Sequence, residues 1–251
     1  ALIFDCDGVL VDTERDGHRV AFNRAFAAVG LDLEWGVELY GELVKISGGK
    51  ERMRHYFDEH GWPPQAGEDH DEFIKELHRI KTDTFMKIIE GKELELRPGI
   101  ERIVDEAIEA GLSLAVCSTS NERAVRTIVE VLLGPERSPH FDAILAGDVV
   151  SKKKPDPEIY ELAKERLGLR ATDGVVRDGV VIEDSRNGLL AAKAAGFPCL
   201  VTTSGYTGDE DFSEADLVVA ELGSSPTDGV SLERIQQQIG RASCRERVCH
   251  R

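Results

Sequence analysis

The amino-acid sequence predicts an α/β fold: a Rossmann-like parallel sheet wound with helices and interrupted by a small inserted helical domain. Three observations predict it. The chain opens with a short apolar run, residues 12–95 carry helical periodicity without strand alternation, and from residue 96 helical stripes alternate with short apolar runs. We therefore expect a core domain built from residues 1–11 and 96–238, and a helical domain built from residues 12–95.

The first expected element is a buried strand over residues 1–4, which is followed by Asp5, Asp7 and Gly8. Side chains two residues apart in a strand point to the same side, so both aspartates are expected to stand together at its carboxyl end. Two crowded carboxylates repel each other unless a cation lies between them, and hard oxygen ligands suit Mg²⁺. The alternative is that one aspartate caps the next segment and the other is solvated.

The inserted segment is expected to form several amphipathic helices. Residues 61–64 and 67–71, rich in glycine, proline and acidic residues, break the pattern between them. The apolar spacing is typical of helix faces that pack into a core, not of a cofactor site. The stripes that we expect to be buried are Phe22, Phe26 and Val29; Trp35, Leu39 and Leu43; and Phe73, Leu77 and Ile80.

The second part of the chain is expected to alternate between helices and strands. Two helix starts carry specific signals: Thr119 with Glu122 matches a capping box, and Asp156 precedes a proline that suits the first helical position. Glycines 111, 168 and 196 end three of the helices. The expected elements are listed here in chain order: a helix over 100–108, a strand over 112–117, a helix from 119, a strand over 143–146, a helix from 156, a strand over 180–182, a helix over 186–195 and a strand over 199–202.

Polar side chains follow four of the expected strands. Besides Asp5 and Asp7, these are Ser118, Lys154 and the pair Glu183 and Asp184. Each has an ordinary structural explanation, as a helix cap, a solvated basic run or a capping pair. Because the carboxyl ends of parallel strands meet at one edge of a sheet, we expect them to converge. A carboxylate nucleophile, a hydroxyl, an ammonium and an acidic pair are what phosphoryl transfer through a carboxylate requires.

Composition limits the class of partner. The 251 residues are 41% hydrophobic, and the formal net charge is −16, which argues against nucleic acid or an anionic membrane as the main partner. No apolar stretch has the length of a membrane-spanning helix. Three of the five cysteines, Cys6, Cys117 and Cys199, lie in apolar runs and are expected to be buried and unpaired, which suits a reducing compartment. We expect a soluble protein and favour a monomer.

Two features of the chain ends affect the interpretation. The sequence starts without Met inside the first strand, so the absence of a targeting peptide says nothing about compartment. Residues 239–251, IGRASCRERVCHR, resemble the read-through translation of a sequencing adapter, and we exclude them from the fold as a non-native tail. A natural basic tail is the alternative.

Four motifs together make this sequence resemble the haloacid dehalogenase (HAD) superfamily. They are DCDGV, VCSTSN, KKKPDP and VIEDS, in that order. The resemblance covers nearly all of residues 1–238, and the insert resembles the small helical cap of that superfamily. More narrowly, DCDGVLVDTERDGHRVAFN, ELYGELVKISGGKERM, CSTSNERAVRTIVEVLLGPER and AGDVVSKKKPDP resemble the CbbY group of plants, algae and photosynthetic bacteria. That group is implied to dephosphorylate xylulose-1,5-bisphosphate, an inhibitor of Rubisco, which implies the chloroplast stroma as the location here.

The resemblance implies a role for each residue at the sheet edge. Asp5 becomes the nucleophile and Asp7 the general acid and base, with Asp5, Asp7 through its main-chain carbonyl, and Asp184 holding Mg²⁺, and Glu183 acting through water. General acid and base help of this kind accelerates a reaction about 10²- to 10⁴-fold. The residues implied to bind the substrate or its phosphate in the core are Asp5, Ser118, Thr119, Asn121 and Lys154.

Substrate choice is expected to lie with the helical cap. Glu14 lies at the hinge, and Gly48, Gly49, Lys50 and Arg52 offer backbone amides and two cations that suit a second, non-reacting phosphate of a phosphosugar. The alternative is a polar turn that opens the next helix. Around residues 17–18 the chain carries one extra residue relative to beta-phosphoglucomutase relatives, so no role for His18 is carried over.

Three functions from different classes therefore remain. A Mg²⁺-dependent sugar-bisphosphate phosphatase is the leading hypothesis, and a phosphatase of another small phosphorylated metabolite would use the same core. A mutase similar to beta-phosphoglucomutase would also use the same residues, but would have to protect its aspartyl phosphate from water. A binding module without catalysis would have no need of both Asp5 and Asp7.

Overall fold

The computed structural model describes residues 1–46, 48–223, 225, 229–235 and 237. It divides into two compact units, unit 1 (Ala1–Asp12 with Glu95–Arg251) and unit 2 (Thr13–Leu94). The sequence-based boundaries place residues 12 and 95 in the helical domain, whereas the structure places both in unit 1. The tail of residues 239–251 lies outside the described residues.

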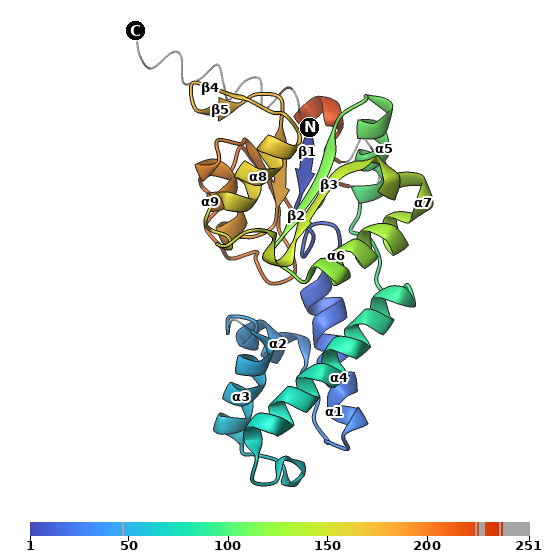
Figure 1. Ribbon diagram of the computed structural model, residues 1–251, viewed down its shortest axis with the longest axis vertical. Helices are drawn as coiled ribbons and strands as arrows, with labels where there is room; N and C mark the ends of the chain where they lie inside the picture. Colours follow the sequence, from blue (N-terminus) through green and yellow to red (C-terminus); the bar gives the residue numbers. More distant parts are fainter. Residues whose placement is uncertain (47, 224, 226–228, 236, 238–251) are drawn as a thin grey trace. The chain divides into compact units, whose positions relative to one another are not determined.

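Unit 1 is built on a six-stranded parallel sheet, which confirms the predicted fold class. The strands lie in the order β3 (Phe141–Ala146), β2 (Leu114–Ser118), β1 (Leu2–Phe4), β6 (Val180–Glu183), β7 (Cys199–Thr202) and β8 (Leu217–Val219) (Figure 1). Strand β1 is central: Leu2 pairs with Leu114 of β2 on one side and with Val180 of β6 on the other. The first residues of the chain therefore stand between segments more than 100 residues away in sequence.

The strands are short apolar runs because both faces of the sheet are covered. Helices α8 (Glu158–Arg166) and α9 (Arg186–Ala194) lie on one side and α5 (Ile100–Glu109) on the other (Figure 1). On the first side, Ile3 and Val181 of the sheet belong to the same buried cluster as Tyr160 and Leu189 of these helices. Burial of such apolar surface stabilises the sheet by about 25 cal/mol per Å².

Two predicted helix starts are wrong by one to three residues. Helix α6 (Glu122–Ile128) is capped by Asn121, whose side-chain oxygen accepts from the amides of Arg123 and Ala124, so the Thr119 capping box does not form. Helix α8 begins at Glu158, after Pro157, and Asp156 Oδ1 accepts from the Glu158 amide at 3.1 Å. In both cases the nearest side chain with a free acceptor oxygen on the entering turn satisfies the first helical amides.

Strand β8 and several other short elements were not predicted, because each is too short to give a periodic signal in the sequence. The antiparallel pair β4 (Ala171–Thr172) and β5 (Val175–Val176) is one of them. The others are α7 (Gly134–Arg137), η4 (Ser138–His140) and η5 (Gly147–Val149), whereas η3 (Val129–Leu133) directly continues the helix expected from residue 119. Cys6, Cys117 and Cys199 are buried free thiols, as predicted.

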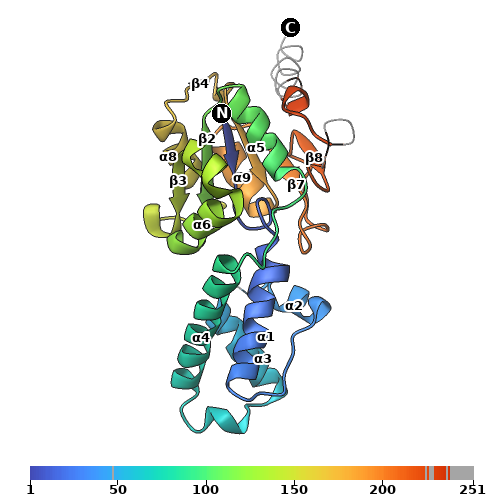
Figure 2. The ribbon, with the colours of Figure 1, turned by 90° about the vertical axis from the view of Figure 1, so that its right-hand side faces the viewer.

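Unit 2 is helical, as its periodicity predicts (Figure 2). It comprises η1 (Thr13–His18), α1 (Arg19–Ala28), α2 (Val37–Leu43), α3 (Gly49–His60), η2 (Pro64–Ala66) and α4 (His70–Glu90). Helices α1 and α4 pack along each other, and the core is aromatic: Phe26 meets Trp35 edge to face with their ring centroids 4.8 Å apart. Segment η1 is a π-helix, a form that accommodates one additional residue in a helical turn. The extra residue expected near residues 17–18 falls there.

Each of the three predicted stripes of unit 2 differs in part from the buried one. Val29, directly after α1, is only half-buried, unlike Phe22 and Phe26. Trp35 is buried but precedes α2, so Leu39 turns outward and is 36% exposed. In α4 the buried stripe contains Ile74, Leu77 and Lys81, while Phe73 and Ile80 are only half-buried. Over the residues that the structure describes, no helix combines the length and the hydropathy that crossing a lipid bilayer requires.

Candidate active site

The carboxyl edge of the sheet in unit 1 brings together the polar residues expected there. Asp5 follows β1, Ser118 ends β2, and Glu183 ends β6 with Asp184 directly after it. The parallel register places these ends side by side, since Phe4 pairs with Val116 and with Ile182. The structure therefore confirms that these segments converge, which is the condition for a single site.

Lys154 is held between two carboxylates at the centre of this edge. Its Nζ atom donates to Asp5 Oδ1 at 2.5 Å, to Glu183 Oε1 at 2.6 Å and to the Cys117 carbonyl at 2.9 Å. The side chain is 8% exposed. Burial alone would lower the pKa of Lys154, but the charges of Asp5 and Glu183 outweigh it and raise the pKa above its ordinary value. Lys154 is therefore a fixed cation, not a member of a solvated basic run.

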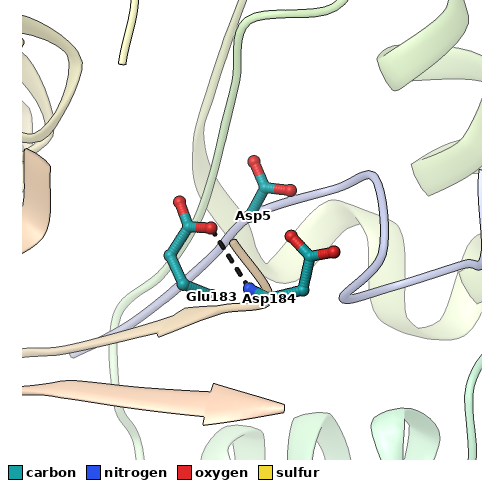
Figure 3. A group of neighbouring side chains, drawn as sticks. All are labelled: Asp5, Glu183 and Asp184. Atoms are coloured by element: carbon teal, nitrogen blue, oxygen red, sulfur yellow. Dashed lines mark hydrogen bonds between the residues drawn. The ribbon is translucent and has the colours of Figure 1, made fainter. Parts of the chain in front are cut away.

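Three carboxylates form a buried acidic cluster beside Lys154 (Figure 3). Asp5, Glu183 and Asp184 each offer an oxygen within 4.8 Å of the others. The pKa of Asp5 is raised to about 8. Burial is the largest cause, the charges of Glu183 and Asp7 act in the same direction, and Lys154 acts against them. Burial, followed by the charge of Asp5, also raises the pKa of Asp184. A divalent cation would relieve this repulsion, and the all-oxygen donor set suits Mg²⁺.

Glu183 differs from the other two acids because its oxygens already have donors. The side chain is fully buried, and Oε1 accepts from Lys154 and from the Tyr160 hydroxyl. Oε2 accepts from the Asp184 amide at 3.2 Å and from the Ser185 hydroxyl at 3.4 Å. Tyr160 was missed as a site residue, because its place in an apolar stripe of α8 gives no signal in the sequence.

The carboxylate of Asp7 lies apart from the acidic cluster. Its Oδ2 accepts from the Ser118 hydroxyl at 3.0 Å, and Ser118 Oγ accepts from the Ser120 amide. We expected Asp5 and Asp7 to share one cation through their carboxylates, but β1 ends at Phe4 and the chain bends into a turn at Gly8, where φ is +83°. The alternation of a strand therefore does not extend to Asp7.

Thr119 and Asn121, expected to bind phosphate, line a cavity of about 550 Å³ in unit 1. The carbonyl oxygen of Asn121 is used to cap α6. The other lining residues come from the start of α6, from η5 and from the loop before α8: Glu122, Gly147, Asp148, Val149 and Lys153. The cavity wall therefore carries both signs of charge.

Unit 2 brings two of its expected site residues together. Glu14 Oε2 accepts from the Tyr40 hydroxyl at 2.6 Å and from Arg52 Nη1 at 3.5 Å, and Arg52 also donates to Tyr40. Arg52 is 6% exposed. Within the described chain its Nε is buried without a hydrogen-bond partner, and Nη2 reaches the Val44 and Ile46 carbonyls only at 3.4 Å. Tyr40 was missed because it forms part of an apolar helix face.

The glycines expected to bind phosphate form the turn into α3. Gly48 has φ of +95°, and Gly49 is the first residue of the helix. A Cβ atom on Gly49 would come within 3.1 Å of the His78 ring. Lys50, one residue further, is exposed. The polar turn and the cation pair thus both exist, although Arg52 is buried and Lys50 is not.

A second basic pair in unit 2 was not predicted. Lys81 of α4 is 8% exposed, and its Nζ lies 2.9 Å from His18 Nδ1 and 4.8 Å from the centre of the Phe22 ring. One turn earlier on α4, burial and then the charges of Lys81 and Lys50 lower the pKa of His78. The available signal was a lysine four residues from both Leu77 and Phe85, at a core position of the α4 stripe.

Comparisons with known proteins agree with this geometry. The family model described as haloacid dehalogenase-like hydrolase matches residues 1–196. A CBBY-like protein of Arabidopsis thaliana is 56% identical over 235 residues, which cover 92% of this chain and 72% of that protein.

Two solved structures show the same relationship. The crystal structure of CbbY from Rhodobacter sphaeroides in complex with phosphate is 40% identical, has a TM-score of 0.70, and covers 88% of this chain and 93% of its own. A mutant of CbbY from the same organism in complex with xylulose-(1,5)bisphosphate has a TM-score of 0.68 at 39% identity and the same coverage.

Proposed function

Since the chain belongs to the haloacid dehalogenase-like hydrolases, and within them to the CbbY group of phosphatases, we propose that it is a Mg²⁺-dependent sugar-bisphosphate phosphatase. We propose xylulose-1,5-bisphosphate as the substrate and Asp5 as the nucleophile. The observation that carries the proposal is the position of the Asp5 carboxylate, in contact with the Lys154 ammonium and within the cluster formed with Glu183 and Asp184.

The core residues divide the phosphoryl transfer between them. A carboxylate oxygen of Asp5 attacks phosphorus, the bond from phosphorus to the ester oxygen breaks, and an aspartyl phosphate forms. Asp7 gives its proton to the leaving alkoxide and later takes one from the water that releases inorganic phosphate and regenerates Asp5. The Ser118 hydroxyl, which contacts Asp7, and the Lys154 ammonium bind the transferring phosphoryl oxygens.

Asp5, Asp184 and the main-chain carbonyl of Asp7 are the groups that we propose to hold Mg²⁺. When bound, the ion supplies positive charge that offsets the negative charge shared by Asp5 and the phosphoryl oxygens. We assign Glu183 an indirect part through water, because both of its oxygens already accept hydrogen bonds from protein donors. The pKa values of Asp5 and Asp184 are both raised, which means that their negative charges are poorly compensated by the protein. A bound cation would compensate these charges.

Recognition of a second phosphate is assigned to unit 2. The buried guanidinium of Arg52, whose Nε lacks a partner among the described residues, is a donor suited to an anion, and the turn at Gly48 and Gly49 adds main-chain amides. Lys50 adds an exposed charge, and Glu14 orients Arg52 together with Tyr40. The solved relative in complex with xylulose-(1,5)bisphosphate supports a sugar bisphosphate. The plant relative supports a place in the chloroplast stroma, where the reaction would remove a Rubisco inhibitor.

Release of inorganic phosphate from a panel of sugar mono- and bisphosphates, with Mg²⁺ and with a chelator, tests the proposal. We expect the highest kcat/KM on xylulose-1,5-bisphosphate, no turnover without Mg²⁺, and none in Asp5→Asn, whose circular dichroism should match the wild type. The organic product is identified by NMR. An isomerised sugar phosphate without phosphate release would identify a mutase, and hydrolysis retained by Asp5→Asn would refute the nucleophile.

A further inference from the structure

Arg97 occupies an unusual position at the carboxyl edge of the sheet in unit 1. Its Nη1 donates to the carbonyls of Gly8 and Thr202, and its Nη2 donates to the carbonyls of Thr203, at 2.7 Å, and Ala220, at 2.9 Å. Thr202 ends β7, Thr203 and Ala220 directly follow β7 and β8, and Gly8 lies in the turn that follows β1. One guanidinium therefore joins three strand ends that are far apart in the sequence.

The contact between Arg97 and Gly8 leads to Asp184. Gly8 lies so close to Asp184 that a Cβ atom on Gly8 would come within 1.9 Å of Asp184 Oδ2. Gly8 also follows Asp7, and the loop is closed by the Gly8 amide donating to the Val11 carbonyl at 2.7 Å. The Arg97 amide donates to the Leu10 carbonyl at 2.8 Å. Arg97 thus holds the loop after Asp7 at two points, through its guanidinium at Gly8 and through its main-chain amide at Leu10. Gly8 lies against one side of the Asp184 carboxylate.

The contact between Arg97 and Thr203 leads to the same carboxylate from another direction. Burial and the charges of Asp5 and Glu183 raise the pKa of Asp184, and the side chain of Ser204, the residue after Thr203, lowers it. The Thr203 amide is fixed by the Val219 carbonyl at 3.0 Å, so this segment continues the pairing of β7 with β8. Gly8, which lies against Asp184, and Thr203, which precedes Ser204, are therefore bound to one guanidinium.

We propose that Arg97 is a positioning residue that sets the place of the Asp184 carboxylate and of the Asp7 main-chain carbonyl, and so sets the affinity of the metal site. This inference rests on the proposed function, which assigns both groups to Mg²⁺. Four carbonyls need four donors in the fixed plane of a guanidinium, and an ammonium has three donors on a single atom. Lysine at this position cannot hold all four strand-end carbonyls at once.

The test measures Mg²⁺ binding to the purified, substrate-free protein by isothermal titration calorimetry, together with Tm and with kcat and KM on the preferred substrate. We expect Arg97→Lys to weaken Mg²⁺ binding about 10- to 100-fold, as loss of a group that orients a metal ligand does. We expect kcat to fall at subsaturating Mg²⁺ and to recover as Mg²⁺ is raised, with KM for the sugar phosphate little changed.

Arg102 provides a matched control. It lies on α5 in unit 1, and its guanidinium likewise donates to main-chain carbonyls, those of Leu222, at 2.8 Å, and Val230, at 3.0 Å. Among the described residues its acceptors, in Glu106, Leu222, Gly223 and Val230, are different from those that Arg97 holds. Arg102→Lys should lower Tm, as Arg97→Lys does, while leaving the affinity for Mg²⁺ at the wild-type value.

Arg97→Ala with added ethylguanidinium keeps the proposal testable if the lysine variant is unstable. Ethylguanidinium should restore Mg²⁺ binding, and ethylammonium should not. A wild-type protein that binds no Mg²⁺ would refute the metal site and this inference with it. Wild-type Mg²⁺ affinity in Arg97→Lys, or equal losses in Arg97→Lys and Arg102→Lys, would refute the role of Arg97 alone.

Discussion

The α-carbon of Gly188 lies directly against the carboxylate of Glu183. A methyl group added there would come within 1.9 Å of the carboxylate carbon and 2.0 Å of both oxygens. Gly188 is in the first turn of α9, where its amide donates to Ser185 Oγ at 3.1 Å. The helix can approach the end of β6 only because this residue has no side chain, and Glu183 in turn holds Lys154.

Gly188→Ala is therefore expected to displace Glu183 or the start of α9. Overpacking of this kind costs about 1–3 kcal/mol of folding free energy, and we expect kcat to fall with it because Lys154 loses its fixed position. Urea denaturation and steady-state kinetics measure the two effects. Gly208→Ala is the control, since a Cβ atom at Gly208 meets nothing within 4 Å. Equal stability and activity in the two variants would contradict the role of this contact.

A second prediction concerns the hydroxyl of Tyr160. Tyr160→Phe keeps the fully buried ring, whose centre lies 5.0 Å from Lys154 Nζ. The change removes only the hydroxyl, which donates to Glu183 Oε1. A hydrogen bond to a charged group contributes about 1.5–3 kcal/mol, so stability should fall by that order. We also expect kcat to decrease more than KM changes, since Lys154 would be drawn toward Glu183 and away from Asp5.

A double-mutant cycle with Glu183→Gln separates this effect from a loss of packing. The effects of Tyr160→Phe and Glu183→Gln on the free energy of unfolding and on kcat should be non-additive, because both changes act on one hydrogen bond. Additive effects would show that the Tyr160 hydroxyl acts independently of Glu183.

The parts of the site that were predictable are those that depend on topology. Ser118, Lys154 and Asp184 each follow an apolar run, and the rule that parallel strands end at one edge was sufficient to bring them to Asp5. The periodicity of residues 12–95 was likewise sufficient to separate a helical unit from the sheet, with bounds one residue too wide at each end. Both inferences use patterns that persist over several turns or strands.

The parts that were not predictable depend on side-chain contacts between elements. Tyr160, Tyr40 and Lys81 lie in stripes of apolar spacing. The sequence can mark such a residue as buried, as for Lys81, but it does not show which polar partner the hydroxyl or ammonium has. The prediction that the Asp7 carboxylate points to the same side as Asp5 was wrong. It assumed that the strand continues to Asp7, but β1 has only three residues and ends at Phe4. Arg97 was missed because main-chain carbonyls, the acceptors that join it to the strand ends, carry no sequence signal at all.

The pH dependence of stability gives a third prediction. Burial raises the pKa of Asp5 from an ordinary value of 3.8 to about 8, so the folded state binds a proton there that the unfolded state has already released. The stability that this proton contributes is fully present below the unfolded pKa and is lost as pH rises through the folded pKa. Lys154, whose pKa is raised, stays charged over this range.

The metal-free wild type should therefore lose stability relative to Asp5→Asn as pH rises from about 4 to about 8, between the unfolded and the folded pKa of Asp5. Chemical denaturation of both proteins in the presence of a chelator measures the difference at each pH. Added Mg²⁺ should reduce the loss in the wild type, because the cation replaces the proton in offsetting the carboxylate charge. Parallel stability curves for the two proteins would show that Asp5 releases no proton in this range.

The last prediction concerns the two cations at the start of α3. Replacing Lys50 and Arg52 by alanine should raise KM for a sugar bisphosphate far more than for a monophosphate, because only the bisphosphate has a second phosphate to bind. A hydrogen bond to a charged group contributes about 1.5–3 kcal/mol, which corresponds to about a 10- to 100-fold change in KM. Steady-state kinetics on matched mono- and bisphosphates measures the difference.

Burial makes the two cations unequal, so they are best changed one at a time. Arg52 is buried against Tyr40 and pairs with the half-buried Glu14, so Arg52→Ala should lower Tm as well as substrate affinity. Lys50 is exposed, so Lys50→Ala should affect affinity alone. Arg54→Ala is the control on the same helix, because Arg54 pairs with Asp71. If KM rose equally for both substrates in Arg52→Ala, the guanidinium would support the fold of unit 2, and the second phosphate would have to be bound elsewhere.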